Sequence, residues 1–519
     1  MKPPPRYPSP SNARLEFFGS SSAETFSREI AESFQGVLTR NMITDPTDAN
    51  LGFVSASIDD RPWYDTMWTR DAGVFLRELV QWGYLEHACL LAEELVKLVQ
   101  PGVEGYQTFP EYFKIGQPGS GSELDGTGAI IIGLILLWER SDQHQPTRQR
   151  IESFLLGSTS PLNYIQIQLE KSPLIAGSGE FGGGCGISGE FYNVVQNNLV
   201  RIALMAAGRM CHSLGNQKLE KEYFNSSNSI LQAMLAHLRD ENGAWIWNID
   251  PITLKPDPTI LNHSINQGFG GINGLLSMTT DISGFSLESY NQELVEASRC
   301  TFTHLFSFPK RKMMFEKYGA WTQFDRLCNG LLTGPSYGQG YATQNMFLMD
   351  QMEMAGKAVD FLAEITQHPF PANWLDRDSD YFFYERYYLP ELLENPATIN
   401  DTGQFFDGKK FDQGCGALNL VCVAEPLKIA RLIVGVDDHD PGQVQFIPRL
   451  PPAWNGYQAE NWPILTSSGL AHYNLHCERR GESLSLDLEH QDGPELMEYK
   501  VRIPVKHGWI WKQIRQVNR

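Results

Sequence analysis

A long succession of amphipathic helical stretches constrains the fold of this chain more than any other feature of its sequence. In the stretch 190–213, apolar residues recur at helical spacing from Val194 to Ala206, and Gly215 stands where a glycine commonly ends a helix. Clusters of Gly, Pro, Asn or Asp separate the stretches. About twelve helices in paired succession predict a toroid of helical hairpins. The stretches lie at roughly 23–39, 70–82, 86–99, 126–141, 147–157, 190–213, 216–238, 267–280, 288–306, 338–366 (room for two helices) and 413–434.

The pattern changes near residue 440. Segments such as SLSLDLEH and YKVRIPV alternate apolar with polar residues and are joined by turns. They predict a small C-terminal antiparallel β-module. We therefore expect a loosely packed Pro/Ser-rich tail over residues 1–22, a mainly α domain over 23–438 and a β-rich module over 439–519.

The charge of the chain narrows the class of its ligand. Its 519 residues carry a formal net charge of −19, whereas nucleic acids and anionic membrane surfaces are bound through basic patches. We therefore expect a neutral ligand and no nucleic-acid or membrane partner. Eight scattered cysteines, without a Cys-x-x-Cys pair or zinc-like histidine spacing, are interpreted as reduced, and no metal or other cofactor is expected.

Neither a leader nor a membrane span is expected. The N-terminal run MKPPPRYPSP has prolines where a signal peptide needs an apolar segment. The most apolar stretch, AIIIGLILLW at 129–138, is too short to cross a bilayer. These patterns predict a soluble, cytoplasmic protein.

The motif WYDTMWTRDAGVFLREL at 63–79 gathers aromatic, acidic and guanidinium side chains where a helix begins. Sugars have apolar faces, which suit aromatic rings, and hydroxyl rims, which suit charge-assisted hydrogen bonds. The alternative is a helix capped by Thr69 with a surface Arg–Asp pair. The candidate substrate-binding residues here are Trp63, Asp65, Trp68, Arg70 and Asp71.

Two further segments carry candidate binding residues. In 111–140, a Gly/Ser-rich loop precedes a strongly apolar helix and brings Glu123 and Asp125 to its start, although Asp125 could instead cap the helix and Glu123 could face solvent. In 333–350, polar and aromatic residues precede a helix and could bind hydroxyls or merely cap and pack. They are Ser336, Tyr337, Gln339, Tyr341 and Gln344, of which Tyr337 and Gln339 are the binding candidates.

The run GSGEFGGGCGISGEF at 177–191 contains the tripeptide Gly-Glu-Phe twice. Glu190 follows Ser188 at the head of a helix, where a carboxylate would complete a cap. Glu180 lies among glycines, where backbone can approach a ligand closely and no helix needs a carboxylate. The same glycines spell Gly-x-Gly-x-x-Gly, but no buried strand precedes them, so a dinucleotide site is not favoured.

The segment before the last helix carries several acidic residues amid phenylalanines. Asp412 is interpreted as a helix N-cap and Asp407, in Asp-Gly, as a turn residue. Glu385 lies upstream. Asp401 has no comparable structural role, so it is the carboxylate most available for chemistry.

These helices and loops resemble the six-hairpin glycosidases, the (α/α)6-barrel clan that includes glucoamylases, α-rhamnosidases and debranching-type glucosidases. The resemblance covers about residues 25–435. Trp68-Thr69-Arg70-Asp71-Ala72 is similar to the Trp-x-Arg-Asp element that holds sugar hydroxyls in the innermost subsite of several of these families. Asp125-Gly126 is similar to the Asp-Gly that opens the fourth glucoamylase helix. The resemblance implies an (α/α)6 toroid and glycoside hydrolysis.

The resemblance also implies where two catalytic carboxyl groups lie. In glucoamylases the general acid precedes the sixth helix, which corresponds to the region from Glu180 to Glu190. The general base of the clan commonly precedes the last helix, and Thr398-Ile399-Asn400-Asp401 partly matches the rhamnosidase run Thr-Ile-Trp-Glu. The glucoamylase run Glu-Gln-Phe would fall on Gly403-Gln404-Phe405, which lacks the carboxylate, and the rhamnosidase acid motif before Trp68 is absent.

Inverting glycosidases need a protonated acid and a carboxylate base about 6.5–9.5 Å apart, with a water between base and sugar. Phe181 and the glycines would desolvate Glu180 when sugar binds and raise its pKa, whereas Asp401 in a polar segment would stay ionised. We therefore expect Glu180 as the acid, then Glu190, and Asp401 as the base, then Asp412 or Glu385.

Three other classes of function fit parts of the pattern. A phosphorylase of the same fold would use inorganic phosphate in place of the base. A polysaccharide lyase would use Tyr or His bases with basic residues for uronates, which the acidic balance disfavours. A carbohydrate-binding protein would bind sugar without hydrolysing it.

Overall fold

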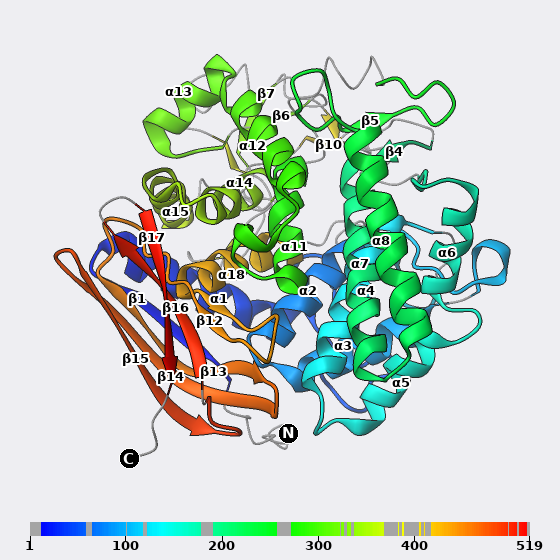
Figure 1. Ribbon diagram of the computed structural model, residues 1–519, viewed down its shortest axis with the longest axis horizontal. Helices are drawn as coiled ribbons and strands as arrows, with labels where there is room; N and C mark the ends of the chain where they lie inside the picture. Colours follow the sequence, from blue (N-terminus) through cyan, green and yellow to red (C-terminus); the bar gives the residue numbers. More distant parts are fainter. Residues whose placement is uncertain are drawn as a thin grey trace.

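The computed structural model of the chain describes residues 12–58, 65–99, 101–117, 122–177, 190–256, 271–321, 323–325, 330–333, 337–367, 382–383, 387–388, 404–405, 409–410, 417–496, 498–505 and 508–515. Helices occupy the upper part, the centre and the right of the molecule, and two sheets lie at its lower left (Figure 1).

Within these residues, six helices form a closed inner ring in which each contacts the next and the last contacts the first. Neighbours surround these helices on most sides, so nearly all residues of α2, α4 and α18 are buried; α4, for example, buries the run AIIIGLILLW. In order around the ring they are α2 (Thr69–Gln81), α4 (Leu124–Arg140), α7 (Val194–Ser213), α11 (Leu275–Ser283), α14 (Tyr337–Leu348) and α18 (Leu420–Val434).

A second set of helices packs outside the ring and alternates with it along the chain. These helices are apolar on one side only; α1 buries Phe26, Ile30 and Phe34 at helical spacing and exposes Arg28. The outer helices are α1 (Ser21–Gly36), α3 (Leu85–Leu98), α5 (Gln145–Leu156), α6 (Pro161–Lys171), α8 (Gln217–His237), α12 (Gln292–Phe306), α13 (Pro309–Tyr318) and α15 (Met352–Gln367). This alternation is the predicted (α/α)6 toroid.

The inner helices run parallel, so they all begin at one end of the ring, which we call the mouth. The first turns of α2 and α4 touch where Gly126 meets Thr69, and α4 meets α7 where Gly128 lies against Leu199. Short strands precede these helix starts, and β4 to β7 and β10 lie in the upper part of Figure 1. They are β2 (Met67–Trp68), β3 (Tyr112–Phe113), β4 (Tyr192–Asn193), β5 (Asn248–Ile249), β6 (Gln323–Asp325), β7 (Gly330–Thr333), β8 (Tyr387–Tyr388), β9 (Gln404–Phe405) and β10 (Lys409–Lys410).

The predicted C-terminal β-module consists of two four-stranded sheets. Their pairs are antiparallel except that β12 runs parallel to β16. One sheet has the order β1 (Arg14–Phe18), β13 (Gly456–Thr466), β14 (Gly469–Arg480), β15 (Ser483–Asp492). The other has the order β11 (Val436–Asp437), β12 (Gln445–Phe446), β16 (Glu498–Val505), β17 (Gly508–Arg515).

The N-terminal part of the chain departs from the expected loose tail. Residues Arg14–Phe18 form β1, which pairs with β13 in antiparallel register. Alternation explains this strand: Leu15 and Phe17 are buried between exposed neighbours, and the Phe17 ring lies 4.9 Å from that of Trp454. The boundaries proposed for the domains stay a prediction.

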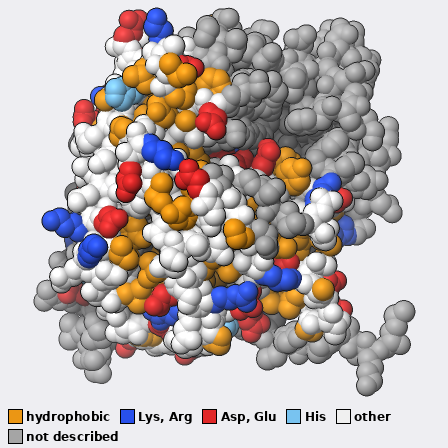
Figure 2. All heavy atoms as spheres, turned by 90° about the vertical axis from the view of Figure 1, so that its right-hand side faces the viewer, with side chains coloured by type: hydrophobic (Ala, Val, Ile, Leu, Met, Phe, Trp, Pro, Cys, Tyr) orange, Lys and Arg blue, Asp and Glu red, His pale blue; other side chains and the backbone are white. Residues whose placement is uncertain are grey.

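The described residues bear on two further properties, which are membrane-spanning helices and the distribution of surface charge. None of their helices combines the length and apolar character that a membrane span requires. On the face shown in Figure 2, acidic and basic side chains of the coloured residues are interspersed rather than gathered by sign.

Candidate active site

Arg70 bridges two carboxylates at the mouth. Its Nη2 lies 3.3 Å from Asp71 Oδ1, and its Nη1 lies 3.4 Å from Asp125 Oδ2. The three side chains are at most 5% exposed, so Arg70 and Asp71 are not the surface pair that the sequence also allowed. Asp125 is the second residue of α4 and therefore does not cap it. One guanidinium between two carboxylates presents fixed, charge-assisted hydrogen-bonding groups.

Glu123 joins this cluster from the N-cap position of α4. Its Oε2 lies 3.3 Å from Thr69 Oγ1, and its side chain is buried rather than facing solvent. The approach depends on Gly126, because a Cβ there would lie 2.2 Å from Thr69 Oγ1. In the Asp-Gly pair, the aspartate thus contacts Arg70 and the glycine lets α2 and α4 meet.

An aromatic pair stands beside the cluster. Trp68 ends β2, and its register partner Tyr112 begins β3. The two rings are 5.4 Å apart, Trp68 is half-buried and Tyr112 is 43% exposed. Such a pair offers an apolar surface next to the polar groups of Arg70 and Asp71.

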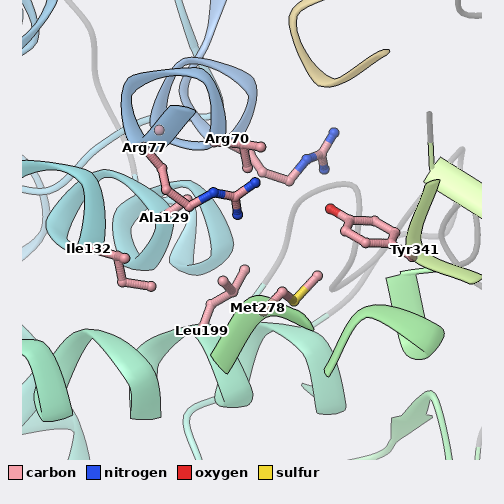
Figure 3. Close-up of a pocket in the computed structure, with 9 residues that line it drawn as sticks. Arg70, Arg77, Ala129, Ile132, Leu199, Met278 and Tyr341 are labelled. Carbon is pink, nitrogen blue, oxygen red and sulfur yellow. The ribbon is translucent and has the colours of Figure 1, made fainter. Parts of the chain in front are cut away.

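A small cavity of about 20 Å³ lies beside Arg70 inside the ring. Figure 3 shows Arg70 and Arg77 extending from α2 toward Tyr341 of α14, with Leu199 and Met278 beneath them. This volume holds about one water molecule. Burial raises the pKa of Tyr341 well above its ordinary value, and Glu425 adds to the rise, so the phenol stays protonated and can donate a hydrogen bond.

A buried network of ion pairs lies two turns deeper along α2. Lys428 Nζ is 2.8 Å from Asp281 Oδ2, and Arg431 Nε is 2.9 Å from Glu78 Oε2. Burial alone would raise the pKa of Asp281, but the charges of Lys428, Arg431 and Arg77 outweigh it and lower the pKa. The network holds α2, which carries Arg70, against α11 and α18. Its members are Arg77, Glu78, Asp281, Glu425, Lys428 and Arg431.

The segment 178–189, which contains Glu180, lies outside the described residues, but both of its flanks are at the mouth. Gly177 and Phe191 exchange two backbone hydrogen bonds, of 3.1 and 3.2 Å. A Cβ on Gly177 would lie 2.9 Å from Leu124, the residue between Glu123 and Asp125. The segment therefore leaves and rejoins the described chain beside the Arg70 cluster.

Glu190 is exposed. It does not cap α7, which differs from the cap role that the sequence favours for it. The N-cap is Asn193, whose Oδ1 accepts hydrogen bonds from the backbone N–H groups of Val195 and Gln196. A catalytic role for Glu190 stays a prediction.

The remaining predicted residues divide into three groups. Asp65 is exposed, two residues before β2. Gln339 is buried apart from the cluster: its oxygen accepts from Trp321 N–H, and its amide donates to the carbonyls of Gly319 and Ala358. Tyr337 begins α14, and its side chain is outside the described part. Trp63, Glu180 and Asp401, and the alternatives Glu385 and Asp412, also lie outside it.

Three residues of the site escaped sequence reasoning. Tyr112 reaches Trp68 through a two-residue strand pair, which leaves no periodic signal. Tyr341 stands among the polar and aromatic residues of 333–350 but is not one of the binding candidates there. Arg77 lies inside α2, and the sequence around a charged residue within a helix does not indicate its partners. Within the residues described, no cluster of three or more His, Cys, Asp or Glu could hold a metal ion.

The ring of paired helices, together with the β-module, defines an (α/α)6-toroid fold. No protein-family model and no curated protein sequence matches the chain. Solved structures do. Glucoamylase from Saccharomycopsis fibuligera is similar with a TM-score of 0.53 at 11% identity, over 80% of this chain and 96% of that one.

Two α-L-rhamnosidases are similar as well. The one from Dictyoglumus thermophilum has a TM-score of 0.56 at 12% identity, over 97% of this chain and 49% of that one. The one from Streptomyces avermitilis, solved with L-rhamnose, has a TM-score of 0.50 at 14% identity, over 96% of this chain and 39% of that one. This chain thus spans half or less of either rhamnosidase, and the similarity establishes the fold.

Proposed function

We propose that this chain is an inverting glycoside hydrolase that acts on a neutral oligosaccharide or glycoside. The observation that carries the proposal is the buried cluster of Arg70, Asp71, Glu123 and Asp125 at the mouth, beside the flanks of segment 178–189. Fixed polar groups of this kind orient sugar hydroxyls, and the Trp68–Tyr112 pair suits an apolar sugar face. The fold shared with a glucoamylase and two rhamnosidases supports the same class of reaction.

In the proposed reaction, Glu180 donates its proton to the glycosidic oxygen as that bond breaks. Asp401 takes a proton from a water molecule whose oxygen bonds to the anomeric carbon from the opposite face. The products are a free alcohol and a sugar of inverted configuration. Glu190 is the alternative acid, and Asp412 or Glu385 is the alternative base.

The two Gly-Glu-Phe copies provide a matched experiment. We expect Glu180→Gln to lose at least about 100-fold in kcat on a disaccharide, the range that general acid catalysis contributes, and far less on a dinitrophenyl glycoside, whose leaving group needs no proton. Glu190→Gln should stay near wild type on both substrates. Proton NMR of the first-formed sugar should show inversion.

Each other outcome has a defined meaning. Loss in Glu190→Gln with normal rates in Glu180→Gln would move the acid to Glu190. Normal rates in both variants would remove this segment from the mechanism. Turnover that requires inorganic phosphate would make the protein a phosphorylase. Binding of disaccharides and aryl glycosides without any turnover would make it a carbohydrate-binding protein.

A further inference from the structure

Exposure at one edge of the candidate site runs opposite to the order that is usual on a protein surface. Charged side chains are usually exposed and large apolar ones buried. Here the charged pair of Arg70 and Asp71 is at most 5% exposed. Tyr112 is 43% exposed, and Ile115 is 51% exposed. The site is therefore charged in its depth and apolar at this edge.

The antiparallel register of β2 and β3 gives the order of the side chains along this edge. Trp68 is the register partner of Tyr112, and the chain runs on from Trp68 to Arg70 in α2. Because the two strands are antiparallel, β3 leads away from Arg70 after Tyr112. Ile115 follows three residues later, which is at most about 10 Å of extended chain. From the Arg70 cluster outward, the order is therefore the Trp68–Tyr112 pair and then Ile115.

Ile115 stands at a position where folding does not require an isoleucine. It is the first residue of a two-residue turn, which the Gln117 N–H closes by donating a hydrogen bond of 3.1 Å to the Lys114 carbonyl. Gly116, the second residue of the turn, supplies a positive φ of 76°. Turns of this kind mostly carry Gly, Pro, Asn, Asp or Ser. The exposed aliphatic side chain beyond Tyr112 is therefore better explained by a ligand than by the core.

We infer that the substrate of this site is a glycoside with an apolar aglycone, and that Tyr112 and Ile115 bind that aglycone. The inference rests on the proposed function, because it takes the Arg70 cluster as the place of the sugar. The Trp68 ring lies between the two and would contact the sugar face. An alkyl or aryl aglycone that extends from the sugar along β3 would remove both Tyr112 and Ile115 from water.

Other occupants match this edge less well. A second sugar ring would bring hydroxyl groups against Ile115, whose side chain offers them no hydrogen bond. A protein partner would need about 800 Å² on each side of an interface, far more than two side chains provide. An apolar aglycone matches both the extent and the chemistry of the edge.

Matched pairs of methyl and hexyl glycosides test this inference in the full chain. Isothermal titration calorimetry would compare the two members of each pair for D-glucose, D-mannose and L-rhamnose, in both anomeric forms. A methylene removed from water on all sides favours binding about fourfold, and one covered on a single side about twofold. For at least one sugar we therefore expect the hexyl glycoside to bind about 30-fold more tightly than the methyl glycoside.

A double variant and a matched control locate the effect. Tyr112→Ser/Ile115→Ser should reduce the hexyl-to-methyl affinity ratio to about threefold or less. Leu214→Ser replaces a residue that is 38% exposed just after α7, at the end of that helix opposite the mouth. This control should keep the ratio near about 30-fold. Unchanged melting temperatures would show that the variants remain folded.

The outcomes separate this inference from the proposed function. Equal affinities within every pair would overturn the inference, and so would a preference for hexyl glycosides that the double variant keeps. Loss of self-association in the double variant, with an unchanged affinity ratio, would overturn it in favour of a second copy of the chain at this edge. Tighter binding of hexyl glycosides without turnover would support the inference and count against hydrolysis. Turnover of a disaccharide without any preference for hexyl glycosides would do the reverse.

Discussion

Glu29 is a buried carboxyl group that makes no hydrogen bond and no ion pair within the described chain. It lies on α1 with no exposed surface, and burial raises its pKa well above the ordinary value. In the unfolded chain the pKa of a glutamate is about 4.3. Between that pH and the higher folded pKa, the unfolded state has lost a proton that the folded state keeps, so stability falls as the pH rises through this window.

Replacing Glu29 by Met should therefore stabilise the protein in a pH-dependent way. We expect a gain of about 1–3 kcal/mol in the free energy of unfolding at pH 7 and a much smaller gain at pH 4. Urea unfolding at the two pH values measures it. Glu24→Met, at an exposed position of the same helix, should change stability by less than about 0.5 kcal/mol. A gain of equal size at both pH values would contradict a raised pKa.

The sequence indicates which residues could form the site, but it does not indicate whether those residues are buried. Arg70, Asp71, Glu123 and Asp125 stand in motifs whose chemistry suits sugars, and the structure brings all four together. Their burial was not predictable, because the same motif is compatible with a surface Arg–Asp pair at a helix start. The four residues are buried because α2 packs closely on α4 at Gly126, and no local sequence pattern indicates that contact.

At the scale of elements, apolar periodicity located most of the helices and failed mainly at their ends. α6 and α13 lie outside the predicted helical stretches, and each begins at a proline, Pro161 and Pro309. Both prolines occupy the first helical position, where the missing N–H costs nothing. The start of α7 was placed at residue 190 because Ser188 and Glu190 resemble a cap, whereas Asn193 supplies it.

Asn193 offers a test of this start. Besides accepting two backbone N–H groups, its Nδ2 donates to Trp247 O and to Asn248 Oδ1. We expect Asn193→Ala to lower stability by about 2–3 kcal/mol, since it removes a cap and two further buried hydrogen bonds. Asn216, the exposed cap of α8, accepts a hydrogen bond from Leu219 N–H. Its alanine variant should cost about 0.5–1 kcal/mol. Equal losses in thermal unfolding would argue against the buried contacts of Asn193.

At the scale of the molecule, residues from both ends of the chain share one sheet. β1 contributes buried Leu15 and Phe17 to the layer between this sheet and α1. Deleting residues 1–11 should leave the melting temperature nearly unchanged, because the register of β1 begins at Arg14. Deleting residues 1–18 should lower it by several degrees and promote association, since β13 would then present an unpaired edge. Equal melting temperatures for the two deletions would show that β1 does not support the sheet.

The pairing of β1 with β13 also determines when β1 can fold during synthesis of the chain. Residues 14–18 leave the ribosome long before their partner strand, which spans residues 456–466. At usual translation rates the wait is roughly 20–90 s. Throughout that time Leu15 and Phe17 have no sheet to join, and the helical ring itself can close only after α18, which ends shortly before β13 begins. A nascent chain arrested just before residue 456 should therefore be a preferred client for chaperones that bind short apolar segments, and release of that client should coincide with emergence of β13.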